Sequence, residues 1–264
     1  MSMKGFSIKT EIEEYDTFEQ YAAQAGLGPE DLVLCGEHTY DKYVAPLSLG
    51  TQTLFREKYG KGEPTDGMVD AILDAMVHSV ESFLSPNGCS ISEIFSAEVL
   101  KTIIRCWKKS VEAGGGDAWK AYAADFLKAS NWAGLGFGYA VCAAVHACAY
   151  PLGSVYHIPH GQSNQLMFKD VMEKYREIRP SGKINDLEDI IGTCLGVSQS
   201  EVFPALYELM DKVLKKEPLR NFGVKESDLP VFAEDVIKTQ QRLLKNNYVE
   251  LSEEQVLEIY KAAY

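Results

Sequence analysis

The fold is decided by residues 65–85, which read TDGMVDAILDAMVHSVESFLS. Apolar residues recur here at intervals of three and four, the spacing that gathers side chains along one side of an α-helix. We therefore expect one long helix over this stretch. Its apolar stripe has the ordinary explanation of packing against a core. Seven residues form the stripe: Val69, Ile72, Leu73, Met76, Val80, Phe83 and Leu84.

Helical spacing continues from this segment to the end of the sequence, broken by turns that contain glycine or proline. We expect seven to nine helices and a mostly α-helical fold. The glycine- and alanine-rich stretch 132–153 is expected to be a buried core helix and not a membrane span, because it carries a histidine. Sequences of the form Ser-x-x-Glu/Gln mark three expected helix starts. These starts are Ser90, Ser198 and Ser252.

The first sixty-five residues follow a different pattern, in which short strands and helices alternate. We expect strands at 6–10 and 31–36, the second of them buried, and helices at 17–25 and 39–47. This alternation is how an α/β nucleotide-binding domain begins.

Composition limits the classes of partner and the compartment. The chain has 264 residues and a net charge of −12, from 26 Lys and Arg against 38 Asp and Glu. Nucleic acids and anionic membranes attract basic surfaces, so this balance disfavours both. Residues 1–10 lack the apolar run of an export signal, and the six cysteines form no CxxC pair. These features predict a cytoplasmic protein with reduced cysteines.

Four residues have the chemistry of a metal site. Asp74 and His78 are one helical turn apart, His146 interrupts an apolar helix, and His160 lies in the loop IPHGQSN. One oxygen and three nitrogen ligands suit Fe(II) or Zn(II), and an open coordination position would make that metal a Lewis acid. Each piece also has an ordinary explanation: an exposed ion pair, a buried core histidine, or a simple turn.

Longer motifs resemble those of the iron-dependent (group III) alcohol dehydrogenases. Residues 74–81, DAMVHSVE, resemble the family's D-A-x-x-H-A-x-E helix, and residues 131–172 resemble its second signature. The resemblance implies four metal ligands: Asp74, His78, His146 and His160. The segment 55–64 (FREKYGKGEP), together with Tyr150 and His157, is similar to the branch of NAD-linked 4-hydroxybutyrate dehydrogenases.

This resemblance implies a fold, a reaction and partners. Residues 66–264 would be an all-helical metal-binding catalytic domain, and residues 1–65 a remnant of an α/β nucleotide-binding domain. The reaction would be the oxidation of 4-hydroxybutyrate to succinate semialdehyde, with hydride passing to NAD and Fe(II), or Zn(II), polarising the hydroxyl oxygen. His157 and Tyr150 are the implied catalytic residues. A homo-oligomer that acts on a small alcohol or aldehyde is implied as well.

The chain departs from the family pattern in two ways. Much of the family has a histidine at the position of Tyr150, near the nicotinamide. The family's GGGS turn and T-T-x-G-T-G-S-E segment, which hold the dinucleotide, are missing, and an insert of about a hundred residues is absent between Leu73 and Asp74. The glycines at 114–116 follow a helix, and those at 134–138 open an apolar helix. Neither run is expected to bind pyrophosphate.

Two other functions stay open at this point. One is a non-catalytic helical metal-binding remnant of such an enzyme, because the missing motifs are those that bind the cofactor. The other is a metal hydrolase, in which the same metal activates water and no dinucleotide is needed.

Overall fold

The structure is a computed structural model that describes residues 17–35, 37–55 and 66–264. Contacts between Cα atoms divide it into two compact units, a smaller one within residues 7–65 and a larger one that contains residues 66–264. The predicted strand at 6–10 lies outside the described residues.

The described residues of the smaller unit form short helical segments and a two-stranded parallel sheet. Helix α1 (Phe18–Ala25) begins where Thr17 accepts a hydrogen bond from the Gln20 amide and ends at Gly26, whose φ of 65° suits glycine. Strand β1 (Leu32–Cys35) pairs in parallel with β2 (Gln52–Phe55). The connection between them consists of three short helical segments: α2 (Glu37–Thr39), a π-helical turn (Tyr40–Val44) and a 3-10 turn (Ala45–Leu47).

These elements confirm the predicted order of a helix, a strand and a second helical segment. We expected the strand at 31–36 to be buried. In the structure it is not, since Leu32 is 59% exposed. Within the described residues β1 has one neighbouring strand, and that strand, β2, was not predicted.

Residues 66–264 of the larger unit form helices and turns without a strand, which confirms the predicted fold class. This unit has ten α-helices within residues 66–264, joined by short 3-10 segments and turns. The helices are α3 (Asp66–Leu84), α4 (Ser90–Glu112), α5 (Ala123–Ala140), α6 (Ala144–Tyr156), α7 (His160–Ile178), α8 (Lys183–Leu195), α9 (Val202–Val213), α10 (Leu229–Thr239), α11 (Gln241–Leu244) and α12 (Glu253–Ala263).

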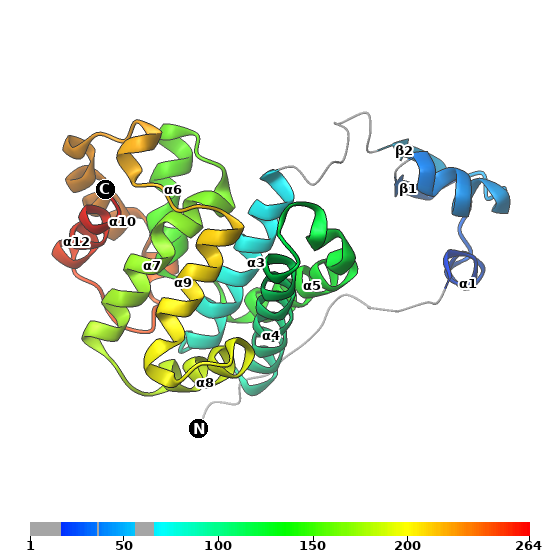
Figure 1. Ribbon diagram of the computed structural model, residues 1–264. Coiled ribbons are helices and arrows are strands. Elements are labelled where there is room, and N and C mark those ends of the chain that lie inside the picture. Colours follow the sequence, from blue (N-terminus) through cyan, green and yellow to red (C-terminus); the bar gives the residue numbers. More distant parts are fainter. Residues whose placement is uncertain (1–16, 36, 56–65) are drawn as a thin grey trace, which may run out of the picture. The chain divides into compact units, whose positions relative to one another are not determined.

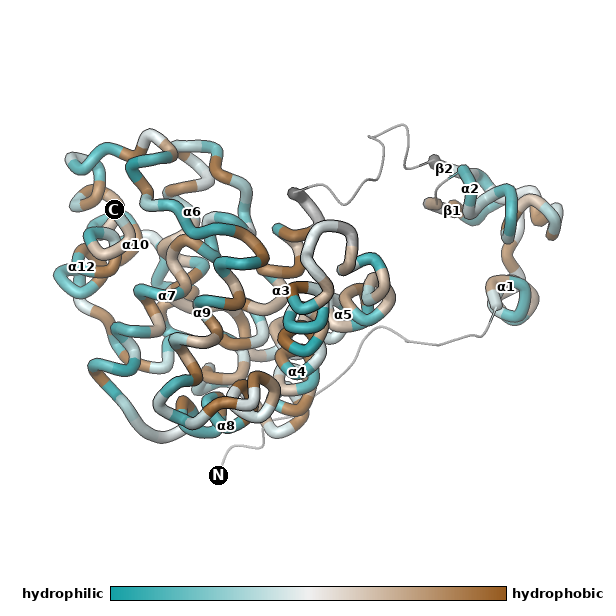
Figure 2. Tube along the Cα trace, viewed as in Figure 1, coloured by the Kyte–Doolittle hydropathy of each residue, from teal (hydrophilic) through white to brown (hydrophobic). Residues whose placement is uncertain are grey.

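Helix α3 is the long helix predicted at 65–85, and it runs through the middle of this unit (Figure 1). It contacts α4, α5, α7 and α8, and its residues Leu73, Met76 and Val80 are fully buried. Small residues let the neighbours approach closely: Ser82 and Ser96 share a hydrogen bond of 2.5 Å between α3 and α4. Figure 2 shows apolar and hydrophilic residues alternating along α4 and α9, which are buried on one side only.

Three sequence-based boundaries are corrected by the structure. The single helix expected at 132–153 is two helices, because α5 ends at Ala140 and α6 begins at Ala144, with a bend of 108° between them. The glycines at 134–138 therefore lie near the end of α5 and do not open a helix. His160 is the first residue of α7 and does not lie in a loop.

Helix starts were mostly predicted correctly. The capping boxes at Ser198 and Ser252 are present, but the residue that caps α4 is Cys89 and not Ser90. In the described part of the chain, no single helix has the length and hydropathy of a membrane span. One pair, residues 118–140 and 144–156, passes that test only when its two bent halves are counted together.

Candidate metal centre

The structure brings the four predicted metal ligands together. Oδ1 of Asp74 lies 3.2 Å from Nε2 of His146 and 3.4 Å from Nε2 of His160. The other oxygen of Asp74, Oδ2, lies 3.3 Å from Nε2 of His78. Ligands about 2.1 Å from a shared zinc ion would lie about 3.0–3.4 Å apart in octahedral or tetrahedral geometry. Each of the three imidazole nitrogens therefore lies at such a distance from a carboxylate oxygen of Asp74.

Each predicted ligand lies within a helix or at its start, and the helix fixes its position. Asp74 and His78 are one turn apart on α3, and His146 lies in the first turn of α6. His160 begins α7, where a Cβ on the next residue, Gly161, would overlap the backbone carbonyl of Asp70 on α3. Only glycine therefore allows α7 to start this close to α3.

Two further carboxylates on α3 hold the starts of the helices that carry the later histidines. Oδ1 of Asp70 accepts a 2.6 Å hydrogen bond from the Gln162 amide, in the first turn of α7. Glu81 accepts hydrogen bonds from the amides of Ala143 and Val145 at the start of α6. The sequence shows Glu81 as part of the D-A-x-x-H-A-x-E motif, but the pattern alone gave it no role.

Asn164 is a site residue that the sequence did not reveal. Its buried Nδ2 lies 2.8 Å from Oδ1 of Asp74, 3.1 Å from Nε2 of His146 and 3.4 Å from Nε2 of His160. Its own Oδ1 is buried without a hydrogen-bond partner. The available signal was its spacing of four residues from His160, which places both on one face once α7 begins at His160.

Cys142 was predicted only as a core residue and lies beside the site. Its Sγ is 3.4 Å from Nδ1 of His78, and the Phe137 ring packs on His78 with 4.2 Å between ring centroids. Among the described residues, two groups have candidate ligand atoms within 4.8 Å of one another. They are His78, Cys142 and His146, and Asp74, His146 and His160.

The charges of the site depend on one another. Burial disfavours the ionised form of Asp74, but hydrogen bonds with His146 and His78 hold its pKa well below the usual range. Burial would lower the pKa of His78, but the hydrogen bond with Asp74 outweighs it and raises that pKa to about 9. Burial is likewise outweighed at His146, where the charge of Glu81 raises the pKa. Burial lowers the pKa of His160. His78 and His146 therefore favour their protonated forms, so binding of a metal at these rings would release protons.

The two predicted catalytic residues have different surroundings. The Tyr150 ring is nearly parallel to that of His160, with 6.2 Å between centroids. His157 ends α6 with a left-handed backbone, φ 56°, and is exposed. Their catalytic roles stay predictions.

The glycines at 114–116 are placed as the sequence predicts. They follow α4 and lead into a 3-10 segment, so they do not form the strand–turn–helix of a dinucleotide site.

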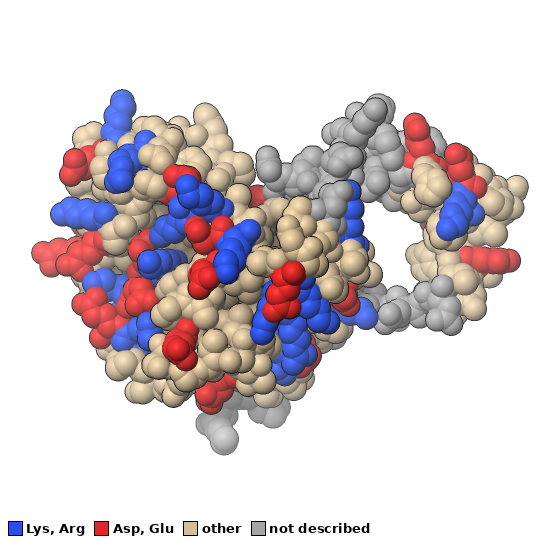
Figure 3. All heavy atoms as spheres, in the orientation of Figure 1, with Lys and Arg blue, Asp and Glu red and all other residues tan. Residues whose placement is uncertain are grey.

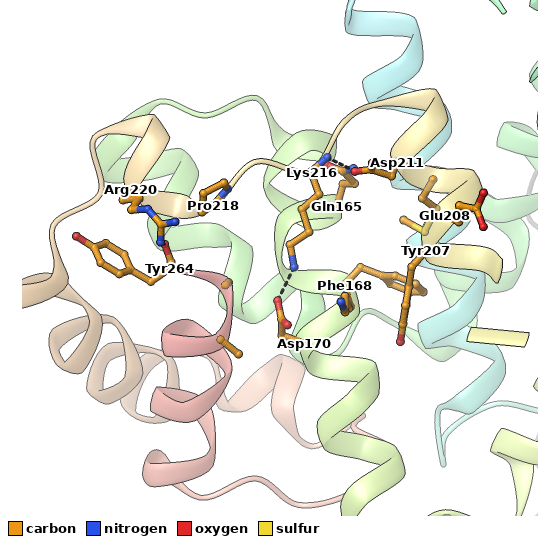
Figure 4. Close-up of a pocket in the computed structure, with 14 residues that line it drawn as sticks. Gln165, Phe168, Asp170, Tyr207, Glu208, Asp211, Lys216, Pro218, Arg220 and Tyr264 are labelled. Carbon is orange, nitrogen blue, oxygen red and sulfur yellow. Dashed lines mark hydrogen bonds and ion pairs between the residues drawn. The ribbon is translucent and has the colours of Figure 1, made fainter. Parts of the chain in front are cut away.

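A separate cavity of about 550 Å³ lies between α7, α9 and the end of α12 (Figure 4). Lys216 connects its two sides, with Nζ 2.5 Å from Asp170 and its amide bonded to Asp211. Arg220 donates to the carbonyl of Tyr264 at 2.6 Å. Each of these charged groups thus has a polar partner, and none is a predicted metal ligand. On the face shown in Figure 3, acidic and basic side chains are interspersed.

Comparison with known proteins places the chain in a family. The model of the C-terminal part of the Fe-containing alcohol dehydrogenase family matches residues 68–264. The 4-hydroxybutyrate dehydrogenase of Clostridium kluyveri is 37% identical over 227 residues, covering 86% of this chain and 61% of that protein. Long-chain-alcohol dehydrogenase 1 of Geobacillus thermodenitrificans is 32% identical over 196 residues, covering 73% and 49%.

Solved structures have the same fold. A 1,3-propanediol oxidoreductase superposes with a TM-score of 0.67 at 23% identity, covering 81% of this chain and 56% of that one. An iron-containing alcohol dehydrogenase from Thermotoga maritima superposes with a TM-score of 0.60 at 25% identity, covering 81% and 53%. The chain thus spans about half to three-fifths of the length of these relatives. On the match across residues 68–264, the chain belongs to the Fe-containing alcohol dehydrogenase family, whose C-terminal helical domain it carries.

Proposed function

We propose that residues 66–264 bind one divalent transition metal, Fe(II) or Zn(II), through Asp74, His78, His146 and His160. The approach of all three imidazoles to the Asp74 carboxylate, at 3.2–3.4 Å, carries the proposal. The donor set of one carboxylate and three imidazoles fits such a metal. When bound, the metal would supply Lewis-acid chemistry toward an alcohol oxygen.

The surrounding residues of this chain bind and orient that set. The Phe137 ring packs against one side of the His78 ring. Tyr150 lies against His160, where its hydroxyl is proposed to face the alcohol. His157, three residues before His160 at the end of α6, is proposed to face the same cleft.

The proposed activity of the complete enzyme is NAD-linked oxidation of a short ω-hydroxy acid, 4-hydroxybutyrate to succinate semialdehyde. The 37% identity with the C. kluyveri protein supports this substrate class. We further propose that this chain as it stands binds NAD weakly and has little or no dehydrogenase activity. Its sequence lacks the two glycine-rich segments that hold the dinucleotide in the family, and the protein itself is negatively charged.

A non-catalytic metal-binding remnant is the second candidate, and the continuity of α3 favours it. The insert missing between Leu73 and Asp74 leaves no break there, because α3 is a single helix over Asp66–Leu84. We propose that residues 1–65 are the remnant of the nucleotide-binding domain.

Metal analysis tests the proposed site. The purified chain, loaded with Fe(II) or Zn(II) and desalted, should retain one metal ion. His146→Ala and His160→Ala should lose it. His38→Ala is the matched control, because His38 lies in α2 of the smaller unit, and this variant should retain the metal. Full occupancy in both site variants would refute the ligand set.

Two assays then separate the enzyme from the remnant. Titration with NADH, followed by its fluorescence, should give no clear binding signal for the metal-loaded chain. An assay with 4-hydroxybutyrate, NAD and metal should show little or no turnover. Turnover in the usual enzymatic range would contradict the proposed loss of activity.

A further inference from the structure

Glu81 is a buried carboxylate in the middle of the helical unit. Its side chain is 0% exposed, and its hydrogen-bond partners come from the bend between α5 and α6. Oε2 accepts from the Ala143 amide at 2.9 Å, and Oε1 accepts from the Val145 amide at 2.6 Å. Oε2 also lies 2.6 Å from Nδ1 of His146. A buried charge is costly unless it is well hydrogen-bonded, and three close donors meet that requirement here.

The hydrogen bonds from the Ala143 and Val145 amides to Glu81 fix the start of α6. The first amides of a helix have no partner within it, and a side chain at the N-cap usually accepts from them. The N-cap of α6 is Ala143, which has no such side chain. Glu81 supplies the missing acceptor from α3, and its negative charge suits the positive end of the helix dipole. The chain reaches this point through Val141 at a φ of 65°, an unusual value for a β-branched residue.

The third contact fixes the His146 ring. An ionised carboxylate only accepts hydrogen bonds, so Nδ1 of His146 must carry a proton and donate it. Nε2 is then the nitrogen that faces Asp74, at 3.2 Å. A metal-binding histidine typically donates its other ring N–H to a carboxylate or carbonyl, which fixes both the tautomer and the ring plane.

We propose that Glu81 is a positioning residue of the metal centre. It holds the proton on Nδ1 of His146, directs Nε2 toward the other ligands, and anchors the bend from which His146 projects. The effect of Glu81 on metal affinity rests on the proposed metal site. The hydrogen-bond geometry on which it stands belongs to the metal-free chain.

A glutamine at this position cannot replace the carboxylate. Its amide group has one oxygen acceptor and one NH2 donor, whereas the two backbone amides and the imidazole all present donors to Glu81. In one orientation Glu81→Gln therefore loses the hydrogen bond from the Val145 amide. In the other it loses the hydrogen bond from the Ala143 amide and also places its NH2 against Nδ1 of His146. The second orientation favours the histidine proton on Nε2, where it would block a bond to a metal.

The first experiment uses the metal-free wild type and reads the ring protonation of His146 by 15N–1H NMR of the histidine side chains. The His146 signals are assigned by their loss in His146→Ala. We expect a proton on Nδ1 whether the ring is neutral or charged. An Nδ1 without a proton would overturn the proposal. This result does not depend on metal binding. A wild type that binds no metal would refute the proposed function, and that failure can be told apart from a failure of the Glu81 proposal.

The second experiment measures Zn(II) affinity by competition with a chelator. Glu81→Gln should bind zinc 10–100-fold more weakly than wild type, the usual effect of losing such a partner. Ser79→Ala is the matched control, because Ser79 is also buried on α3 but bonds only the Ala75 carbonyl of its own helix. It should keep the wild-type affinity. Circular dichroism checks that each variant is folded.

Glu81→Asp extends the test if Glu81→Gln does not fold. It keeps the charge but shortens the side chain, so metal affinity should fall between those of wild type and Glu81→Gln. A purely structural cap would change the unfolding midpoint but leave zinc affinity and the His146 protonation unchanged. Zinc affinity within twofold of wild type in a folded Glu81→Gln or Glu81→Asp variant would overturn the proposal.

Discussion

The side-chain nitrogen of Asn164 lies 2.8 Å from Oδ1 of Asp74, in the space bounded by Asp74, His146 and His160. The same three residues form one of the two candidate metal-binding groups. An amide nitrogen has only donor hydrogens, so at Asp74 Oδ1 it occupies a lone pair that a metal would need. Asn164 and a metal ion therefore compete for this carboxylate oxygen.

Removing this amide should strengthen metal binding. Asn164→Leu has a side chain of similar size but no donor, so the metal no longer displaces hydrogen bonds. A net hydrogen bond is worth about 1 kcal/mol, so we expect Zn(II) affinity to rise by about fivefold in a chelator competition.

Gln165→Leu is the matched control for that measurement. Gln165 is the next residue on α7, and its side chain donates to the Leu214 carbonyl, away from the ligands. Its zinc affinity should equal that of wild type. Weaker binding by Asn164→Leu would contradict the competition and would instead make the amide oxygen a ligand.

A methyl group at Gly161 should disturb the site from the side of α7. The Cβ of Gly161→Ala would overlap the Asp70 carbonyl, so the start of α7 and His160 must move away from α3. Overpacking of this kind typically costs about 1–3 kcal/mol, and zinc affinity should fall as well. Urea unfolding and metal titration measure the two effects.

Gly134→Ala provides the opposite case. Gly134 lies within α5, and a Cβ there meets no atom within 4 Å. Alanine is favoured over glycine inside a helix by about 1 kcal/mol, so this variant should be stabilised. If both glycine variants shifted stability in the same direction, the close approach at Gly161 would not be the cause.

The metal-free protein should lose stability as the pH rises toward 9. His78 has a folded-state pKa of about 9, above its ordinary value of 6.5. Its protonated form therefore stabilises the fold fully below pH 6.5, and that contribution is lost as the pH rises through 9. Urea unfolding with a chelator present, at intervals between pH 6.5 and 9.5, measures the trend. A stability that is flat or rising over this range would argue against the pairing of His78 with Asp74.

Thiol counting tests the state of the cysteines. All six lie in the described residues, and none is in a disulfide. Under native conditions the half-buried Cys35 and Cys89 should react first, because the other four are buried. Protein prepared without reductant and then denatured should expose six thiols. A lower count with defined disulfides would contradict the prediction of reduced cysteines.

The sequence by itself determined most helices and singled out the four residues that we propose as metal ligands. Helical periodicity placed α3 and put Asp74 and His78 on one face, because an α-helix repeats every 3.6 residues. The resemblance of residues 131–172 to the family's second signature added His146 and His160. Capping chemistry is equally local, which is why the helix starts at Ser198 and Ser252 were predicted correctly.

Only the tertiary structure decided how these ligands are held. The break at 141–143 was invisible in the apolar run, because it depends on amides that bond to Glu81, more than sixty residues earlier in the chain. The role of Asn164 likewise depends on three atoms from three helices that meet only in the fold. The periodicity of apolar residues indicates which face of a helix is buried. A hydrogen bond between distant segments does not change the residue spacing within either segment, so it cannot be predicted from that spacing.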